Sequence, residues 1–373
     1  MVIRAIMDKT ERRRPDRGPG LFHLRGWTNL IIIPAAAGEN ADEKCTELKE
    51  WEAFIMIQAI FRNVAVIGTG IIGRGWVRVF AGAGCRTRLY DRDQRQLDKA
   101  QKWLEASYEA DVSDGLISPD EAESCRARIS VHPQIVDALG EAEYVQEGGP
   151  EVLEVKRELF AQLDSLARPS AILASSASSL DVNEVVAGLP GVSRCLLAHP
   201  FNPPHIIPVV EVMPTKKTDP EVTAKTLAFL RSIGQKPVLV NFYLPGYLIN
   251  RLQAAVVREA IHLVTRGAAS VEDVDAVVSD GLGLRWALLG NFGVNNTNAD
   301  GGVREYYSRY KDTYRSILED LDPAPPAFDP EMIELIGRGV DAMSGKATVA
   351  EVCRWRDRLV RKIRDLKSGN PHP

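Results

Sequence analysis

Cysteine is scarce in this sequence, and no two cysteines are spaced as a functional pair. Five cysteines are scattered over 373 residues, and no CxxC motif occurs. An odd number at wide spacing favours neither a disulfide framework nor a zinc site. We therefore expect no bound metal and a reducing, cytoplasmic location.

The chain also lacks long apolar runs and an excess of charge of one sign. Its 46 basic and 50 acidic residues give a formal net charge of −4, so we expect neither nucleic acid nor an anionic membrane as a partner. Apolar stretches such as residues 31–37 are far shorter than the roughly 20 residues of a membrane-spanning helix. We predict no membrane span.

Residues 1–61 differ from the rest, because they show no sustained hydrophobic period and begin with an arginine-rich stretch interrupted by prolines. We interpret them as a poorly ordered extension, or as the product of a start codon assigned too early, with Met56 as the natural start. A targeting segment is the alternative, but Asp8, Glu11 and Asp16 are unusual for a transit peptide.

From residue 62 onward, apolar β-branched runs alternate with helical stretches. The runs are VAVIG, TRLYD, ISV, EYVQE, AILAS, CLLAH, VVEVM and PVLVN. Their alternation is typical of a parallel, doubly wound sheet. After residue 245 the strand signals stop and helical spacing takes over. We predict an α/β fold in which a Rossmann-type doubly wound sheet, residues 62–245, precedes an all-α C-terminal domain, residues 246–373.

A glycine-rich turn follows the first run, with Gly68, Gly70 and Gly73 in the pattern GxGxxG. At a turn from strand to helix, missing side chains let a pyrophosphate approach the backbone and the helix N-terminus. Ile71 and Ile72 lie between the last two glycines and belong to the same predicted cofactor-binding turn. Such turns also serve purely structural ends, so a further residue is needed to support a dinucleotide.

Asp91 is that residue, because it ends the second run about 20 residues after the turn. Its carboxylate would accept hydrogen bonds from the adenosine ribose and repel a 2′-phosphate, which favours NAD over NADP. Arg92 and Arg95 leave NADP open, although surface charge is the simpler interpretation of Arg95. NAD is the predicted cofactor.

His199 and Glu211 form a possible proton-transfer pair. Oxidation of a secondary alcohol needs a base for the hydroxyl proton, and histidine has a pKa suited to that exchange. His199 ends the run CLLAH, at the strand end where doubly wound sheets bind ligands. Glu211 is surrounded by valines, so its carboxylate would need a partner if buried. Exposure of Glu211 on the solvent face of an edge strand is the alternative.

Two further polar elements fit a substrate site. The serine run SSASS over residues 175–179 follows the strand AILA, and one of its hydroxyls could bind a substrate oxygen, although helix capping is the simpler role. Asn250 lies in the first turns of a long predicted helix. Its amide could bind substrate or join the helix to a loop.

These motifs, in this order, resemble the L-3-hydroxyacyl-CoA dehydrogenase superfamily, and more closely its lambda-crystallin / L-gulonate 3-dehydrogenase branch. They are VAVIGTGIIGRGW, PEVLEVKRELF, SSASSL, AHPFNPP, VEV, GYLINRLQ, DGLGLRWALLG and CRWRDRLVRKIRDLKSG, and the last two point to the branch. The chain departs from the branch at residues 290–293, where GNFG stands in place of GP followed by an acidic residue.

The resemblance implies a role for each of several residues. It makes His199 the base and Glu211 its partner, Ser178 and Asn250 the substrate-binding residues, and Glu151 and Lys156 contacts on the nicotinamide side of the cofactor. The pattern of residues alone would make Glu151 and Lys156 an exposed pair in the first turn of a helix.

The substrate is harder to predict. Coenzyme A carries several phosphates and its binders usually offer cations, yet the predicted hairpin over residues 98–129 is rich in acids. That favours a small L-3-hydroxy acid such as L-gulonate, whose carboxylate would need one cation. Arg285 is our first choice for that cation and Arg251 the second, although either could form an interdomain salt bridge.

Three functions therefore remain. The first is an NAD-dependent dehydrogenase of a small 3-hydroxy acid, most simply L-gulonate. The second is an L-3-hydroxyacyl-CoA dehydrogenase. The third is a non-catalytic, crystallin-like nucleotide-binding protein. What argues against this third function is the presence of the base, its partner and both substrate-binding residues, namely His199, Glu211, Ser178 and Asn250. The apolar C-terminal helices exceed what one small helical domain should bury alone, so we also expect a homodimer joined through them.

Overall fold

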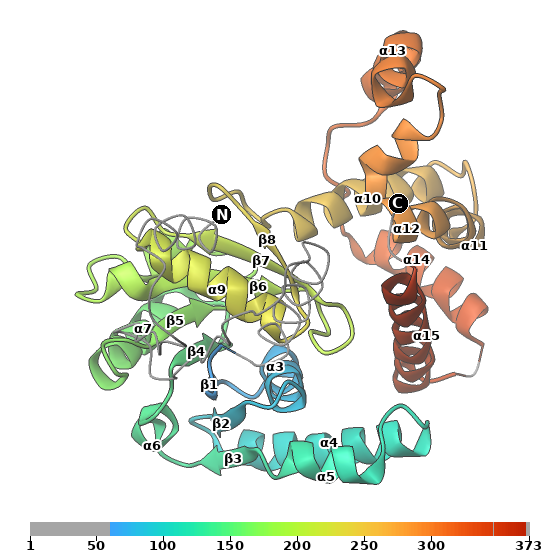
Figure 1. Ribbon diagram of the computed structural model, residues 1–373. Helices are drawn as coiled ribbons and strands as arrows, with labels where there is room; N and C mark the ends of the chain where they lie inside the picture. The colour runs from blue at the N-terminus through green and yellow to red at the C-terminus, as the bar shows by residue number, and fades with distance from the viewer. Residues whose placement is uncertain (1–59, 346, 371–373) are drawn as a thin grey trace, which may run out of the picture. The chain divides into compact units, whose positions relative to one another are not determined.

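The computed structural model describes residues 60–345 and 347–370, so most of the predicted extension, residues 1–61, lies outside it. Strands and helices alternate up to residue 239, and from residue 249 on the described chain is helical (Figure 1). The strands are β1 (Asn63–Ile67), β2 (Arg86–Tyr90), β3 (Ile129–His132), β4 (Tyr144–Glu147), β5 (Ile172–Ser175), β6 (Cys195–Pro200), β7 (Val209–Pro214) and β8 (Lys236–Leu239). The predicted fold class is confirmed.

All of these strands belong to one sheet, in the order β3-β2-β1-β4-β5-β6-β7-β8. Strands β1 to β6 are parallel, as predicted. The prediction of a wholly parallel sheet is wrong at β7, which runs antiparallel to β6 and parallel to β8. Only residues 201–208 join β6 to β7. A parallel connection needs a crossover of about a dozen or more residues, so this short loop can only reverse the chain.

Helices cover both faces of the sheet. They are α3 (Ile71–Gly82), α4 (Gln94–Ser113), α5 (Pro119–Arg126), α6 (Ile135–Leu139), α7 (Leu153–Leu166), α8 (Val182–Val185) and α9 (Pro220–Ser232). One core cluster joins α3, α4 and α9 to the sheet, and a second joins α6, α7 and α8 to it. Two separate cores on one sheet are what a doubly wound fold requires.

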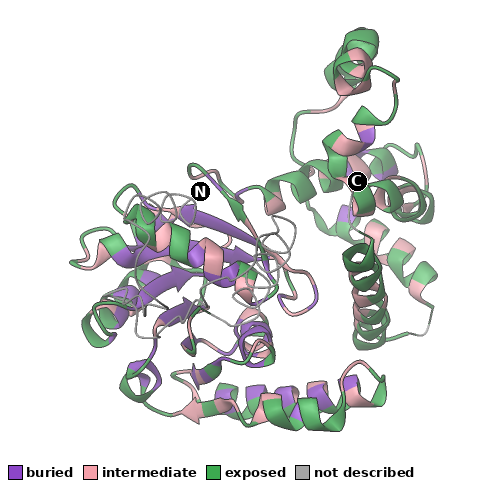
Figure 2. Cartoon of the chain, viewed as in Figure 1, coloured by how far each residue is buried: buried purple, intermediate pink, exposed green. Residues whose placement is uncertain are grey.

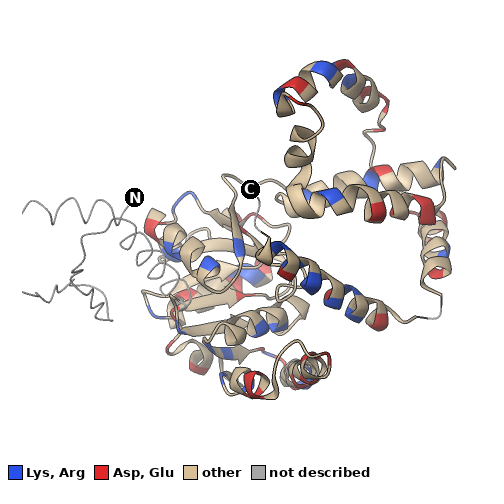
Figure 3. Cartoon of the chain, turned by 45° about the vertical axis from the view of Figure 1, so that its right-hand side comes forward, with Lys and Arg blue, Asp and Glu red and all other residues tan. Residues whose placement is uncertain are grey.

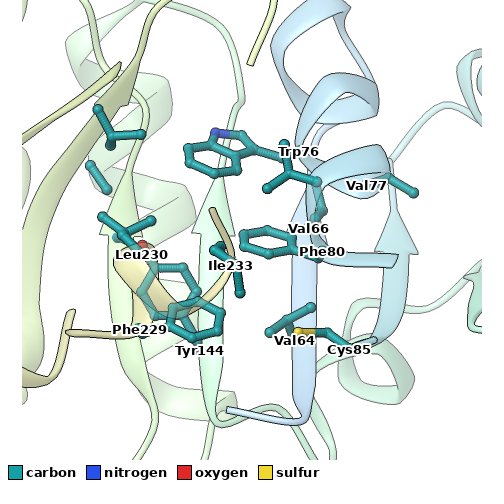
Figure 4. Packing of buried hydrophobic residues seen from close by; sticks show 14 of the residues in the cluster. Val64, Val66, Trp76, Val77, Phe80, Cys85, Tyr144, Phe229, Leu230 and Ile233 are labelled. Atoms are coloured by element: carbon teal, nitrogen blue, oxygen red, sulfur yellow. The ribbon is translucent and has the colours of Figure 1, made fainter. Parts of the chain in front are cut away.

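Aromatic rings fill the first core (Figure 4). Trp76 and Phe80, one turn apart on α3, stack with ring centroids 5.1 Å apart. Tyr144 on β4 and Phe229 on α9 close the space beside them, with their centroids 5.0 Å apart. Phe61 packs against both of these rings, at 5.9 and 4.9 Å, so the core begins two residues before β1.

Helix starts follow the side chains that can cap them. Asp219 accepts a hydrogen bond from the amide of Glu221 at the start of α9. Ser118 and Glu121 form a capping box that begins α5 and closes the hairpin with α4. These caps satisfy amides that have no partner within the helix.

The second part of the chain is helical, as predicted. It contains α10 (Ile249–Thr265), α11 (Val271–Ala276), α12 (Gly283–Asn296), α13 (Gly302–Asp320), α14 (Pro330–Ser344) and α15 (Val349–Gly369). A π-helical segment, Val277–Leu282, joins α11 to α12, and Gly290 interrupts α12 with a positive φ of 69°. Most residues of these helices are exposed or half-buried (Figure 2). Within the described residues, none of the helices has the length and apolarity to cross a membrane.

The last helix binds the α4–α5 hairpin through buried charges. Arg361 on α15 donates to Asp111 on α4 at 2.9 Å, and Arg78 on α3 binds the other carboxylate oxygen. All three side chains are nearly buried. Arg78 also lies over the ring of Tyr108, with its guanidinium carbon 4.3 Å from the centroid. One carboxylate thus joins two arginines that lie far apart in the sequence.

Candidate active site

The glycine turn between β1 and α3 has the geometry that its sequence predicts. Gly68 has a φ of 102°, and a Cβ there would lie 2.6 Å from the carbonyl oxygen of Gly148. A Cβ on Gly73 would lie 1.9 Å from the carbonyl oxygen of Gly68, so this glycine permits the close approach of helix and turn. A Cβ on Gly70 would meet nothing within 4 Å, yet Gly70 lines a cavity. Space, not protein packing, surrounds this glycine, which suits the approach of a ligand.

Asp91 lines the same cavity, which has a volume of about 590 Å³. Its Oδ2 accepts hydrogen bonds from the amide and the hydroxyl of Thr69, at 2.9 and 2.8 Å. The carboxylate is therefore held in place before any ribose arrives. Arg92 also lines the cavity, whereas Arg95 pairs with Asp93, whose pKa is lowered by this hydrogen bonding. These residues fit a dinucleotide whose adenosine end lies beside Asp91.

His199 and Glu211 lie directly opposite each other in the β6–β7 register. The Nδ1 atom of His199 is 2.7 Å from Oε2 of Glu211. Glu211 is only 1% exposed, which excludes the alternative that it faces solvent on an edge strand. Because the carboxylate holds Nδ1, it fixes the tautomer and leaves Nε2 as the nitrogen with an available lone pair.

The other oxygen of Glu211 reaches the helical part of the chain. Oε1 accepts hydrogen bonds from the amides of Leu248 and Ile249, at 2.6 and 2.8 Å, at the start of α10. Amides at a helix start have no partner within the helix, and negative charge is favoured there. One carboxylate thus holds the imidazole of His199 and caps α10.

A second cavity, of about 340 Å³, is lined by five of the predicted site residues. Its lining includes His199, Ser178, Asn250 and Glu151. Ile72, Asn202 and Gln253 also line it, and of these only Ile72 was predicted as a site residue, from the cofactor turn. The structure therefore gathers residues from five separate segments of the chain around a single space.

The two predicted substrate arginines do not line this cavity, and none of its described lining residues is a lysine or an arginine. Arg251 follows Asn250 on α10, but its side chain is exposed and reaches towards the carbonyl oxygen of Pro245, at 3.5 Å. Arg285 is exposed on α12. A carboxylate ligand in the cavity would need a cation from beyond this lining.

Lys156 is buried rather than exposed, so the simple interpretation of Glu151 and Lys156 as an exposed helix pair is wrong for the lysine. Its Nζ lies 2.8 and 3.0 Å from the two carboxylate oxygens of Glu147, which is fully buried, and 3.8 Å from Glu151. Glu147 also accepts from the amide of Gly149, which lines both cavities. Glu147 was not predicted as a site residue, although an acid at the end of a buried strand is itself a signal.

The serine run is held by Glu151 rather than used as a helix cap. Asp181 caps α8, so the capping role considered for the serines is not theirs in that helix. Oε1 of Glu151 accepts from the amides of Ser178, Ser179 and Leu180. Partial burial acts to raise the pKa of Glu151, but these amides and Lys156 outweigh it and lower that pKa. The carboxylate is thus ionised at neutral pH.

Comparison with known proteins agrees with this geometry. The family model described as "3-hydroxyacyl-CoA dehydrogenase, NAD binding domain" matches residues 63–242, and the corresponding C-terminal domain matches residues 246–334. The lambda-crystallin homolog of Bos taurus is 38% identical over 312 residues, which cover 83% of this chain and 97% of the relative. A 3-hydroxyacyl-CoA dehydrogenase of Gibberella moniliformis is 38% identical over 282 residues, or 73% of this chain and 81% of the relative.

A solved structure shows the same architecture. It is that of a 5-formyl-3-hydroxy-2-methylpyridine 4-carboxylic acid 5-dehydrogenase, described as an NAD+ dependent dismutase. It superposes with a TM-score of 0.70 at 26% identity, and the match covers 84% of this chain and all of that one. The matching family models and relatives show that the chain belongs to the 3-hydroxyacyl-CoA dehydrogenase family of NAD-dependent dehydrogenases, and its glycine turn and cavities agree with this.

Proposed function

We propose that this protein oxidises the 3-hydroxyl of a small L-3-hydroxy acid, with L-gulonate converted to 3-dehydro-L-gulonate. The observation that carries the proposal is the His199–Glu211 pair, 2.7 Å apart, beside a cavity that Ser178 and Asn250 also line. This arrangement supplies a base with a fixed tautomer and two polar groups for one substrate oxygen.

In the proposed mechanism, NAD+ supplies the hydride acceptor when it is bound. Neutral His199 takes the proton of the C3 hydroxyl on Nε2, because Glu211 holds Nδ1. Glu211 then stabilises the imidazolium, and its own position is fixed by the two amides of α10. Ser178 and Asn250 hold the oxygen as the carbon loses its hydride and the carbonyl forms. On the cofactor side, Glu151 and Lys156 flank Gly149 and support the wall shared by both cavities.

Charges on the α4–α5 hairpin support a small substrate over a coenzyme A thioester. Lys and Arg are interspersed with Asp and Glu along the helices (Figure 3). In the hairpin, Arg126 is engaged by Glu105 and Glu123, and Asp111 is occupied by Arg78 and α15. Arg126 is thus paired with protein acids, and Arg78 and Arg361 share one carboxylate, so these three arginines are engaged within the protein, which favours a substrate without several phosphates. A 3-hydroxyacyl-CoA substrate stays the alternative, because one relative carries that name.

The substrate carboxylate requires a cation, and we propose that Arg285 supplies it, with Arg251 as the second choice. Neither lines the cavity, so contact would require movement of the helical part or a second copy of the chain. If one arginine binds the carboxylate, its replacement by glutamine should raise the KM for the hydroxy acid about tenfold and leave the Kd for NAD unchanged. If both variants keep the KM of the unmodified chain, neither arginine binds the substrate carboxylate.

The proposed reaction is tested by following NADH formation by the purified full-length chain with NAD+ and either L-gulonate or L-3-hydroxybutyryl-CoA. We expect turnover of gulonate alone. Turnover confined to the thioester would overturn the choice of substrate, and NAD binding without turnover of either compound would support the non-catalytic, crystallin-like alternative.

We further propose a cytoplasmic homodimer joined through residues 246–373. Support comes from the exposed apolar side chains of α10 and α12, and from the free state of the four cysteines in the described part of the chain. The domain boundary between residues 245 and 246 is likewise proposed, and the two family models meet there. Sedimentation equilibrium of the purified protein should give twice the monomer mass, and a monomer at micromolar concentration would contradict the dimer.

A further inference from the structure

The segment from Ser178 to Leu180 is bound on both sides by groups from distant parts of the chain. Its three consecutive amides donate to one oxygen, Oε1 of Glu151, at 2.8, 2.7 and 3.2 Å. Glu151 lies between β4 and α7, about 28 residues earlier in the chain. One carboxylate therefore fixes the orientation of three peptide units, the first of which carries the proposed substrate-binding serine.

The carbonyl oxygens of the same three residues are also bound. The Nδ2 atom of Asn250 donates to Ser178 at 3.3 Å, the hydroxyl of Tyr243 donates to Ser179 at 2.7 Å, and the hydroxyl of Tyr247 donates to Leu180 at 2.5 Å. All three donors lie within residues 243–250, which connect β8 to α10 and form its first turn. Three consecutive residues are thus held between Glu151 and this connection.

Tyr247 occupies the central place in the connection. It is fully buried, and its φ of 49° lies in the left-handed region, which is unfavourable for a residue with a bulky side chain. Its ring lies 5.6 Å from that of Tyr243 and 6.0 Å from the imidazole of His199, measured between centroids. The next two amides in the chain are those that bind Glu211. The conformation of Tyr247 therefore affects the position of both the serine segment and the His199–Glu211 pair.

We infer that Tyr247, assisted by Tyr243, is a positioning residue that holds Ser178 and the Glu211-binding turn of α10 in register with His199. The inference rests on the proposed function for the roles of Ser178 and His199, but the contacts themselves do not depend on the substrate. Neither tyrosine lines either cavity. They act through the peptide carbonyls of the serine segment.

The test compares the full-length chain with Tyr243→Phe, Tyr247→Phe and the double variant. Phenylalanine keeps the ring and removes only the hydroxyl donor. Tyr310→Phe is the matched control, because Tyr310 lies on α13 and lines neither cavity. Hydrogen exchange of the amides of residues 178–180 is measured first, without substrate, and the Kd for NAD second. Steady-state kinetics with L-gulonate follow.

We expect each hydroxyl removal to speed exchange of these three amides about fivefold, and the double variant more than either alone. The kcat of the double variant should fall about tenfold or more, with KM and the Kd for NAD changed less than threefold, because the loss concerns alignment in the transition state. Tyr310→Phe should match the unmodified chain.

Unchanged exchange and unchanged kcat in the double variant would overturn the inference. If the unmodified chain does not oxidise L-gulonate, the proposed function fails, but the exchange experiment still decides whether the tyrosines hold the segment. If Tyr247→Phe does not fold, Tyr243→Phe carries the test, since its half-buried hydroxyl binds the middle carbonyl of the segment.

Discussion

The part of the chain that forms the sheet, residues 61–240, and the helical part, residues 249–370, differ in where they place their large apolar side chains. In the sheet part these side chains fill two buried clusters, the first of which is shown in Figure 4. In the helical part, Leu252 and Phe292 are each 72% exposed, and many further apolar residues are exposed with them. The first part completes its own core, whereas the second leaves apolar surface exposed, which is the kind of surface that supports the proposed dimer.

The two parts also contribute differently to the site. The sheet part supplies His199, Glu211 and the glycine turn, while the helical part supplies Asn250 and the amides that bind Glu211. The turnover number, kcat, should therefore depend most on residues of the sheet part. The helical part should matter through the contacts that join it to the sheet.

The largest effect is expected for His199→Asn, which removes the proposed base from the sheet part. We expect kcat to fall about a thousandfold, within the range for loss of a general base, while the Kd for NAD changes less than twofold. Rates of NADH formation and isothermal titration with NAD measure the two quantities. His132→Asn, at the end of β3, is the control and should keep its activity. Full turnover by His199→Asn would exclude this histidine as the base.

Asp111→Asn should produce the next largest effect, because it breaks a buried junction between the two parts. The substitution leaves Arg78 and Arg361 without their shared countercharge. Loss of one partner from a buried ion cluster typically costs about 3 kcal/mol of unfolding free energy. Urea denaturation measures this cost. Glu221→Gln breaks an exposed pair with Lys225 and should cost less than about 1 kcal/mol. If Asp111→Asn and Glu221→Gln unfold with the same free energy, the contact between Arg361 and Asp111 does not hold α15 in place.

The same junction predicts a pH dependence through His205. Burial, with smaller contributions from Arg78 and Arg361, lowers the pKa of His205 to about 3, although Asp111 acts to raise it. The unfolded chain binds a proton near the ordinary pKa of about 6.5. The neutral buried form therefore stabilises the fold fully above that pH, and this stability is lost as the pH falls below it. Between pH 7 and pH 5 the loss should be about 2 kcal/mol.

His205→Gln provides the comparison for this loss. The difference in unfolding free energy between pH 7 and pH 5 should be about 2 kcal/mol smaller in the variant than in the unmodified chain. Urea denaturation at the two pH values measures it. Identical pH dependence in both proteins would mean that His205 titrates normally in the folded state.

The sheet part was also the more predictable from sequence. A short apolar run marked every strand, and the GxGxxG turn and Asp91 needed only local spacing. His199 and Glu211 could be paired because an acid among valines needs a partner. The antiparallel direction of β7 was not predicted, because a run of apolar residues does not indicate in which direction its strand runs.

Contacts that depend on distant residues could not be predicted. Arg361 and Asp111 are 250 positions apart, and nothing in either neighbourhood marks them as partners. Similarly, no local pattern marks Tyr247 as the residue whose hydroxyl binds a carbonyl 67 positions away. Burial of Lys156 was likewise missed, because its spacing fits an exposed helix face equally well. Such contacts are set by how the elements pack, and the pattern of each element alone does not contain them.

The smallest effect is expected within the sheet part, from Thr69→Val. Valine has the shape of threonine but lacks the hydroxyl that donates to Asp91, while the backbone amide of residue 69 keeps its hydrogen bond. With one of these donors gone, the carboxylate is less firmly held for the ribose. A single hydrogen bond contributes about 1 kcal/mol, so the Kd for NAD should rise about fivefold with kcat at saturating NAD unchanged.

Thr297→Val is the matched control from the helical part, since its hydroxyl binds only the carbonyl of Val294 at the end of α12. Its Kd for NAD should equal that of the unmodified chain. A fivefold effect at Thr69 with none at Thr297 would place cofactor affinity in the sheet part alone. Equal weakening by both substitutions would instead mean that the helical part contributes to NAD binding, and would break the contrast between the two parts.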